Sequence, residues 1–241
     1  MSTSSTAAQK FGPARANEYQ AQSRIALAGY DACHELAACM LSATLGAGST
    51  ARLLVVGAGG GAQEIITAGL LEPNWRFTAV DPSTPMMDIA LENLEQKGLA
   101  ARTDIHLGYV DGLAPDQHFD AATLIGVLHH QPGEETKRQL LRSIASRLRP
   151  GAPLILAGNR HAYTSQPLLL AAWSESWRMQ GATAEEVRAK LGKILEGADP
   201  PASEEVVAEL LAGAGFEQPT WFFSSLLWGA CLAKRASDYQ A

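Results

Sequence analysis

The sequence of 241 residues lacks any apolar run long enough to cross a bilayer: no segment approaches the roughly 18 continuous apolar residues of a membrane helix. Its first ten residues, MSTSSTAAQK, also lack the basic-then-apolar order of a secretory signal. These absences favour a cytoplasmic protein that does not bind membranes. We interpret residues 1–15 as a disordered tail and residues 16–241 as a single domain.

Cysteine and positive charge are scarce as well. Cys33, Cys39 and Cys231 form no CxxC pair, and their odd number indicates buried, reduced thiols rather than a disulfide framework or a metal site. The net charge of −6 argues against a long nucleic-acid footprint, which would need a basic face. We therefore expect no metal and no nucleic-acid partner, while a homodimer stays open.

What the sequence does contain is a regular alternation of short β-rich runs and helical stretches. Apolar spacing from Glu18 to Leu45 predicts one or two helices ahead of a sheet. Strands are expected at Arg52–Val56, Arg76–Val80, Thr103–Val110, Asp120–Ile125 and Pro153–Ala157. Helices are expected near Gly61–Leu70, Pro85–Gln96 (with Thr84 as N-cap) and Glu134–Leu148. This alternation is typical of a parallel, doubly wound α/β sheet.

The pattern changes after Gly158. Residues from His161 to Leu195 have helical spacing and end in GADPPAS, and a further helix is expected at Glu204–Ala212. The last stretch predicts two strands that close the sheet as an antiparallel hairpin. Residues 159–200 would then lie over the carboxyl ends of the strands, where open α/β sheets bind ligands, so we predict a helical lid there. Trp173 and Trp177 on this segment would face either the sheet or the mouth of the site.

The stretch LLVVGAGGGAQEI carries the main functional signal. A strand that ends in glycines at positions 57, 59, 60 and 61 brings bare backbone close to a ligand at a helix N-terminus. Asp81 follows Gly61 by 20 residues, at the end of the second strand, where a carboxylate can accept both ribose hydroxyls. The glycines fit the loose dinucleotide pattern GxGxxA and also the GxGxG of methyltransferases. The spacing therefore leaves NAD, S-adenosylmethionine and a glycine turn without ligand as alternatives.

The chain resembles the class I S-adenosylmethionine-dependent methyltransferases over nearly its whole length. The matching pieces are VVGAGGG, FTAVDPSTPMM, GYVDGL, FDAATLIGVLHHQP and RLRPGAPLIL. Two end motifs, LAGYDACHEL and LAGAGFEQPTWFFSSLLWGACLAK, look like the carboxy-S-adenosylmethionine synthase of the tRNA wobble-uridine pathway and its methyltransferase relatives. The resemblance implies a Rossmann-like fold with a seven-stranded, mostly parallel sheet, a terminal antiparallel hairpin and the lid.

The resemblance also implies cofactor contacts at matching positions. Tyr30 would cap the methionine portion of S-adenosylmethionine, and Asp81 would hold the ribose diol. The other implied contacts are Gly57, Ala58, Gly59, Gly61, Pro82, Met86, Tyr109, Val110 and Leu124.

Two positions depart from the family pattern. Val55 stands where these enzymes usually carry an acidic residue near the cofactor's amino group, and Tyr109 stands where many carry an aspartate for the adenine. Asp111 lies two residues beyond Tyr109. Glu64 either replaces the missing carboxylate near Val55 or faces solvent, and the sequence does not distinguish these alternatives.

His129 and His130, in VLHHQP, follow the fourth strand near the place of methyl transfer. Either could act as a general base, or one could cap the strand while the other lies on the surface. We expect a methyltransferase for a small or medium acceptor molecule. The alternatives are a carboxy-S-adenosylmethionine synthase-like enzyme, a non-catalytic cofactor-binding protein and an NAD-dependent oxidoreductase. The resemblance implies that the arginine of the synthase's lid falls near Leu191, between Lys190 and Lys193, and a leucine there favours the ordinary cofactor.

Overall fold

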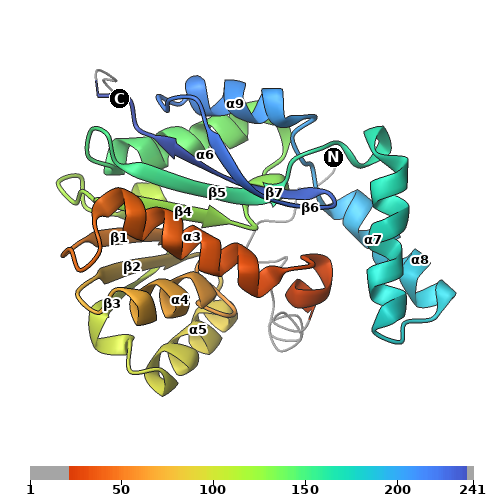
Figure 1. The fold of residues 1–241 in the computed structure, drawn as a ribbon, viewed down its shortest axis with the longest axis horizontal. Helices are drawn as coiled ribbons and strands as arrows, with labels where there is room; N and C mark the ends of the chain where they lie inside the picture. Colours follow the sequence, from red (N-terminus) through yellow and green to blue (C-terminus); the bar gives the residue numbers. More distant parts are fainter. Residues whose placement is uncertain (1–21, 238–241) are drawn as a thin grey trace.

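The computed structural model describes residues 22–237 (Figure 1). The predicted tail over residues 1–15 lies outside this range. The strands are β1 (Arg52–Val56), β2 (Arg76–Asp81), β3 (Thr103–Leu107), β4 (Ala121–Ile125), β5 (Pro153–Asn159), β6 (Thr220–Ser225) and β7 (Trp228–Lys234). The helices are α3 (Tyr30–Leu45), α4 (Gln63–Leu71), α5 (Thr84–Gln96), α6 (Gly133–Arg147), α7 (Pro167–Met179), α8 (Ala184–Gly197) and α9 (Glu204–Ala212).

The strands form one sheet in the order β3-β2-β1-β4-β5-β7-β6. The strands β1 to β5 pair in parallel, whereas β7 lies antiparallel between β5 and β6. The predicted fold, a mostly parallel sheet closed by an antiparallel hairpin, is therefore confirmed. The strand order reverses beside β1, and such a switch point leaves a crevice at the carboxyl ends of the strands.

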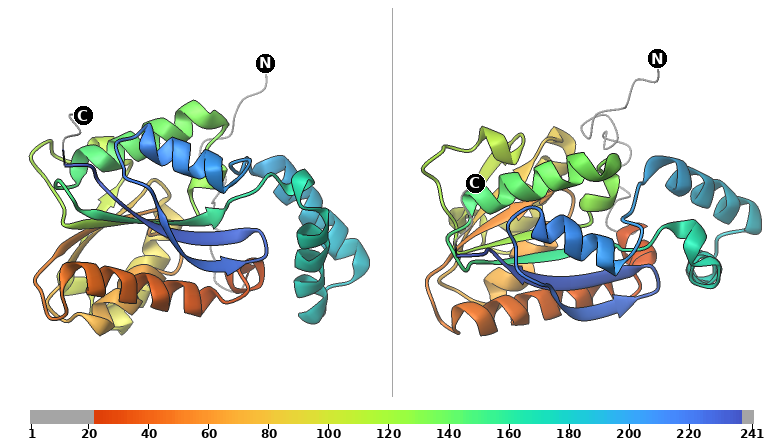
Figure 2. Two further views of the ribbon diagram at one scale, coloured as in Figure 1. Left: turned by 45° about the horizontal axis from the view of Figure 1, so that its top comes forward. Right: turned by 90° about the horizontal axis from the view of Figure 1, so that it is seen from above.

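Helices cover both faces of the sheet because its central strands are apolar on both sides. In β1, Leu53 and Val55 pack in the core beneath α3, α4 and α5, while Leu54 and Val56 pack in the core beneath α6 and α9. Figure 2 shows α3 on one side of the sheet and α6 with α9 on the other. Among the described helices, none is both long and apolar enough to span a bilayer.

Several boundaries differ by one or more residues from the sequence prediction, and three of the differences have a local reason. The third strand ends at Leu107, because the chain turns at Gly108 with a φ of +153°. The N-cap of α5 is Ser83, so Thr84 is already helical and Pro85 lies in the first turn. The helical stretch after Gly158 is two helices, separated where Gly181 takes a φ of +88°.

The helices α7 and α8, which we call the arm, stand out from the body beyond the strand ends (Figure 2). Trp173 on α7 is buried, and its Nε1 donates a hydrogen bond to the carbonyl oxygen of Ala26 at 2.7 Å. Trp173 also packs in a small apolar cluster with Tyr163 and with Leu227 in the hairpin turn. The arm therefore packs against the N-terminal segment and the hairpin.

Candidate cofactor site

A cavity of about 320 Å³ lies at the carboxyl ends of β1, β2 and β4. Seven of the predicted cofactor positions line it: Gly57, Gly59, Asp81, Pro82, Met86, Tyr109 and Val110. They come from three segments that are distant in the sequence and adjacent in the sheet. No residue from α7 or α8 is among its lining residues.

The glycine loop fits this cavity only without side chains. Gly57 has a φ of +79°, and a Cβ there would collide with the side chain of Val127. A Cβ on Gly59 would lie 2.6 Å from Cβ of Met86 and 2.7 Å from Oδ2 of Asp81. The loop backbone therefore lies directly against the Asp81 carboxylate, because no side chain separates them.

The carboxylate of Asp81 is held in one orientation by the backbone. Its Oδ2 accepts a hydrogen bond from the Gly59 amide at 3.1 Å, and its Oδ1 accepts one from the Ser83 amide at 2.8 Å. Burial raises the pKa of Asp81, although these two amide donors partly oppose the shift. Because each carboxylate oxygen has a further lone pair, the group can still accept hydrogen bonds from a ligand in the cavity.

Four of the predicted contacts do not line the cavity. Ala58, Gly61 and Leu124 are buried and are not among its lining residues. Tyr30 lies at the start of α3, with its ring centroid 4.3 Å from that of His34 and the Arg24 guanidinium 4.6 Å above its ring. Their roles toward a cofactor stay predictions.

The cavity has a wall that the sequence analysis did not identify. It is one face of α6, formed by Thr136, Gln139, Leu140 and Ser143. Their spacing of three and four residues marks a single helix face. The spacing in the sequence shows that these residues share one face of α6. It does not show that this face, rather than another face of the helix, meets a ligand. Gly126, Val127 and Gln131 complete the wall.

The two histidines occupy different environments. His130 lines the cavity, whereas His129 is buried with its ring over Gly158. Burial holds the pKa of His129 well below its usual range, and nearby His130 and Lys137 lower it further. Of the two predicted candidates, His130 is therefore the one that lines the cavity, and its role as a base stays a prediction.

Glu64 is half-buried and does not line the cofactor cavity. It lines a second cavity of about 10 Å³ between α3 and the sheet, together with His34, Val55 and Thr123. Burial raises the pKa of Glu64, and the neighbouring His34 partly opposes this. Glu64 therefore lies beside Val55, and its role toward the cofactor's amino group stays a prediction.

A buried lysine, Lys137, bonds the turn after β4 to the segment that follows α8. The side chain of Lys137 is 2% exposed, and its Nζ donates to the carbonyl oxygen of Gln131 at 2.7 Å and to Oδ2 of Asp199 at 2.8 Å. Asp199 lies just beyond α8, and its backbone amide donates to the His129 carbonyl oxygen at 2.7 Å. The end of the inserted segment is thus bonded directly to the turn that lines the cavity.

Residues 54–154 match a family model described as a methyltransferase domain. No curated protein matches the chain at the sequence level. Similar solved structures include a candidate O-methyltransferase from Nostoc punctiforme, which is 16% identical, with 91% of this chain and 59% of that chain covered and a TM-score of 0.66. Human N-acetylserotonin methyltransferase in complex with S-adenosylmethionine is 17% identical, with 93% and 57% covered and a TM-score of 0.65.

An O-methyltransferase family 2 protein from Planctomyces limnophilus, in complex with apigenin, is 21% identical. The match covers 77% of this chain and 50% of that chain, with a TM-score of 0.60. The chain thus spans between half and three fifths of the length of these three structures. Residues 54–154 therefore resemble a methyltransferase domain, and the chain shares its fold with these three structures.

Proposed function

We propose that this chain transfers a methyl group from S-adenosylmethionine to a small organic acceptor. The observation that carries the proposal is the cavity that joins the glycine loop, the fixed Asp81 carboxylate and the turn after β4. An adenosine cofactor needs a carboxylate for its ribose diol and bare backbone beside its charged portion, and this cavity offers both.

The residues of the cavity would bind and orient rather than react. Asp81 would hold the ribose, Pro82 and Tyr109 would contact the adenine, and the Gly57 backbone would line the methionine portion. The bound cofactor supplies an electrophilic methyl group on its sulfonium. Because that group needs no covalent help, alignment and exclusion of water provide most of the rate. His130 would accept the proton that the acceptor loses.

The structural neighbours favour oxygen as the atom that is methylated. Two of the three described above are named as O-methyltransferases, and one of these was solved with the polyphenol apigenin. We therefore infer a hydroxyl group on a small molecule as the acceptor. A homodimer and a cytoplasmic location stay predictions.

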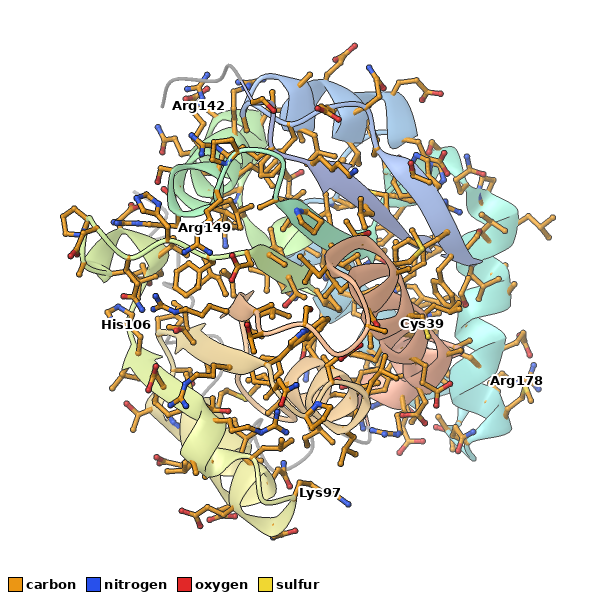
Figure 3. All side chains as sticks on the ribbon, turned by 60° about the vertical axis from the view of Figure 1, so that its left-hand side comes forward. Cys39, Lys97, His106, Arg142, Arg149 and Arg178 are labelled. Carbon is orange, nitrogen blue, oxygen red and sulfur yellow. The ribbon has the colours of Figure 1, made fainter. Side chains whose placement is uncertain are left out.

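The arm favours the ordinary cofactor over its carboxylated form. A carboxylated sulfonium needs a cationic partner, but Leu191 packs in the apolar cluster of the arm. Arg178 projects outward from α7 and pairs with Glu175 at 2.8 Å (Figure 3). The Nζ of Lys190 lies 4.8 Å from the centroid of the Trp177 ring. None of these side chains lines the cavity.

Calorimetry and a transfer assay test the proposal together. We expect S-adenosylhomocysteine to bind with a micromolar dissociation constant and NAD to bind at least about tenfold more weakly, a gap of about 1.4 kcal/mol. Labelled methyl from S-adenosylmethionine should then appear on a phenolic acceptor. Binding without transfer to any hydroxyl compound would indicate a non-catalytic cofactor-binding protein instead.

A further inference from the structure

Three buried polar atoms without a hydrogen-bond partner lie near the carboxyl ends of β4 and β5 and the start of β7. They are Nδ1 of His129, Oδ1 of Asn159 and Nε1 of Trp228. Asn159 ends β5 and is the cross-strand partner of Trp228, whose ring meets the His129 ring edge-on with the centroids 5.3 Å apart. His129 and Asn159 are each only 5% exposed. Buried polar groups in native proteins are almost always paired, so this cluster indicates a missing partner.

The cluster borders the cofactor cavity. Gly126 lines that cavity, and Cη2 of Trp228 is the nearest atom to the place where a Gly126 side chain would begin, at 3.6 Å. His130, which follows His129 directly, lines the same cavity. An acceptor must hold its reacting atom about 3–3.5 Å from the methyl group, so the rest of its body has to occupy space beside the cofactor. The carboxyl end of β5 and the start of β7 lie beside the cofactor cavity, where the body of the acceptor would be.

We propose that Asn159 and Trp228 form the polar end of the methyl-acceptor subsite, and that the acceptor is planar and uncharged, with one N–H or O–H donor and one carbonyl oxygen. This proposal rests on the proposed methyltransferase function. Nδ2 of Asn159 already donates to the Tyr163 hydroxyl at 2.8 Å, which orients the amide and leaves Oδ1 for the acceptor's donor. Nε1 of Trp228 donates to the carbonyl oxygen.

The surrounding charges select an uncharged acceptor. Arg160, the residue after Asn159, pairs with Glu204 at 2.5 Å and donates to the Ser224 hydroxyl at 2.6 Å. The cation that approaches His129, Lys137, is occupied by its own carboxylate partner. Each cation is already paired with a carboxylate of the chain, and a further, uncompensated carboxylate or phosphate is costly to bury. The amide oxygen of Asn159 and the indole N–H of Trp228 are uncharged, so they suit hydrogen bonds to an uncharged acceptor.

An aromatic cover closes this subsite. Tyr163 lies four residues beyond the end of β5, and its ring stacks on that of Trp173 in α7 with the centroids 6.0 Å apart. Both rings belong to the buried cluster that joins the arm to the hairpin turn. Entry of an acceptor therefore requires this cover to move. The arm acts at the acceptor's entrance, which agrees with its absence from the cofactor cavity.

Two probes of matched shape test the proposal on the full chain saturated with S-adenosylhomocysteine. The first, p-hydroxybenzamide, offers an N–H donor and a carbonyl oxygen, whereas p-hydroxybenzoate replaces them with a carboxylate. The five tryptophans are replaced by fluorotryptophan, and the Trp228 signal is assigned with Trp228→Phe. We expect the amide to shift the Trp228 fluorine resonance and to bind at least about tenfold more tightly than the benzoate.

Variants with matched controls locate the contact. Trp228→Phe and Asn159→Leu should each weaken binding of the amide about tenfold in ligand-observed NMR. Trp75→Phe is the control for the indole, because Nε1 of Trp75 donates to the Ser49 hydroxyl at 3.2 Å, at the opposite end of the sheet from the cluster. Asn74→Leu is the control for the amide, since Asn74 donates to the Gly48 carbonyl oxygen at the opposite end of the sheet. Both controls should bind the probe within about twofold of the unaltered chain.

Several outcomes would overturn the subsite. An unchanged Trp228 resonance at millimolar amide would mean that water alone fills the cluster. Equal binding of amide and benzoate, or equal losses in the control variants, would remove the assigned contacts. Retained binding of S-adenosylhomocysteine without any probe response refutes the subsite alone. A chain that does not bind S-adenosylhomocysteine refutes the proposed function itself.

Discussion

The ribose assignment predicts a specific loss of affinity when Asp81 becomes Asn. Each carboxylate oxygen accepts one backbone amide, from Gly59 or from Ser83. In the asparagine side chain, an NH₂ group replaces one of the two oxygens, so that a hydrogen-bond donor faces a backbone N–H. The negative charge is lost as well. The charge-assisted hydrogen bonds to the ribose are worth about 1.5–3 kcal/mol. We therefore expect Asp81→Asn to bind S-adenosylhomocysteine about 10- to 150-fold more weakly.

Titration calorimetry measures this change directly, and Asp88→Asn is its control. Asp88 is an exposed carboxylate on α5, so its substitution changes the net charge equally without touching the cavity. The thermal unfolding of both variants should show a folded chain. Unchanged affinity in Asp81→Asn would refute the ribose assignment, and an equal loss in Asp88→Asn would show that the effect is not local.

Three further changes test the surroundings of the site. Gly158→Ala places a methyl 2.9 Å from Nδ1 of His129 and should lower the free energy of unfolding in urea by about 1–3 kcal/mol, whereas Gly192→Ala on α8 should raise it by about 0.5–1 kcal/mol. Partial burial raises the pKa of Asp199, but hydrogen bonds from its lysine partner and a backbone amide outweigh this and lower it. Asp199 therefore contributes to the free energy of unfolding above the ordinary aspartate pKa, and this contribution is lost as the pH falls through the lowered pKa of the folded chain. We expect Asp199→Asn to reduce the free energy of unfolding near about pH 7 and to change it little near about pH 2. Equal losses at both pH values would contradict the ion pair. S-adenosylhomocysteine should slow proteolysis within residues 195–203, because Asp199 is bonded to the turn beside the cavity; equal cleavage with and without ligand would remove that coupling.

Short-range sequence patterns predicted most of the strands and helices and the position of the glycine loop. The strand Arg52–Val56 and the helix Glu204–Ala212 lie where their apolar spacing placed them. The glycine loop and Asp81 meet as expected, because parallel neighbouring strands bring their carboxyl ends to one edge of the sheet. These features depend on short-range patterns, and their spatial relation follows from the fold class alone.

Features set by tertiary packing could not be predicted in the same way. The sequence treats His129 and His130 alike, yet only the second lines the cavity, since the bare backbone of Gly158 makes room for the first. The tryptophans of the arm were expected to face either the sheet or the site. The Nε1 of Trp173 instead donates a hydrogen bond to Ala26, which lies 147 positions earlier in the chain. No local pattern specifies such a contact.

The central claim, an adenosine cofactor site built for S-adenosylmethionine, is tested most directly by a competition in native mass spectrometry. The chain is mixed with equal concentrations of S-adenosylhomocysteine, NAD and carboxy-S-adenosylmethionine, so that one spectrum reports all three complexes. The glycine loop and Asp81 predict that the S-adenosylhomocysteine complex dominates. A dominant NAD or carboxy-S-adenosylmethionine complex, or the free chain alone, would contradict the account.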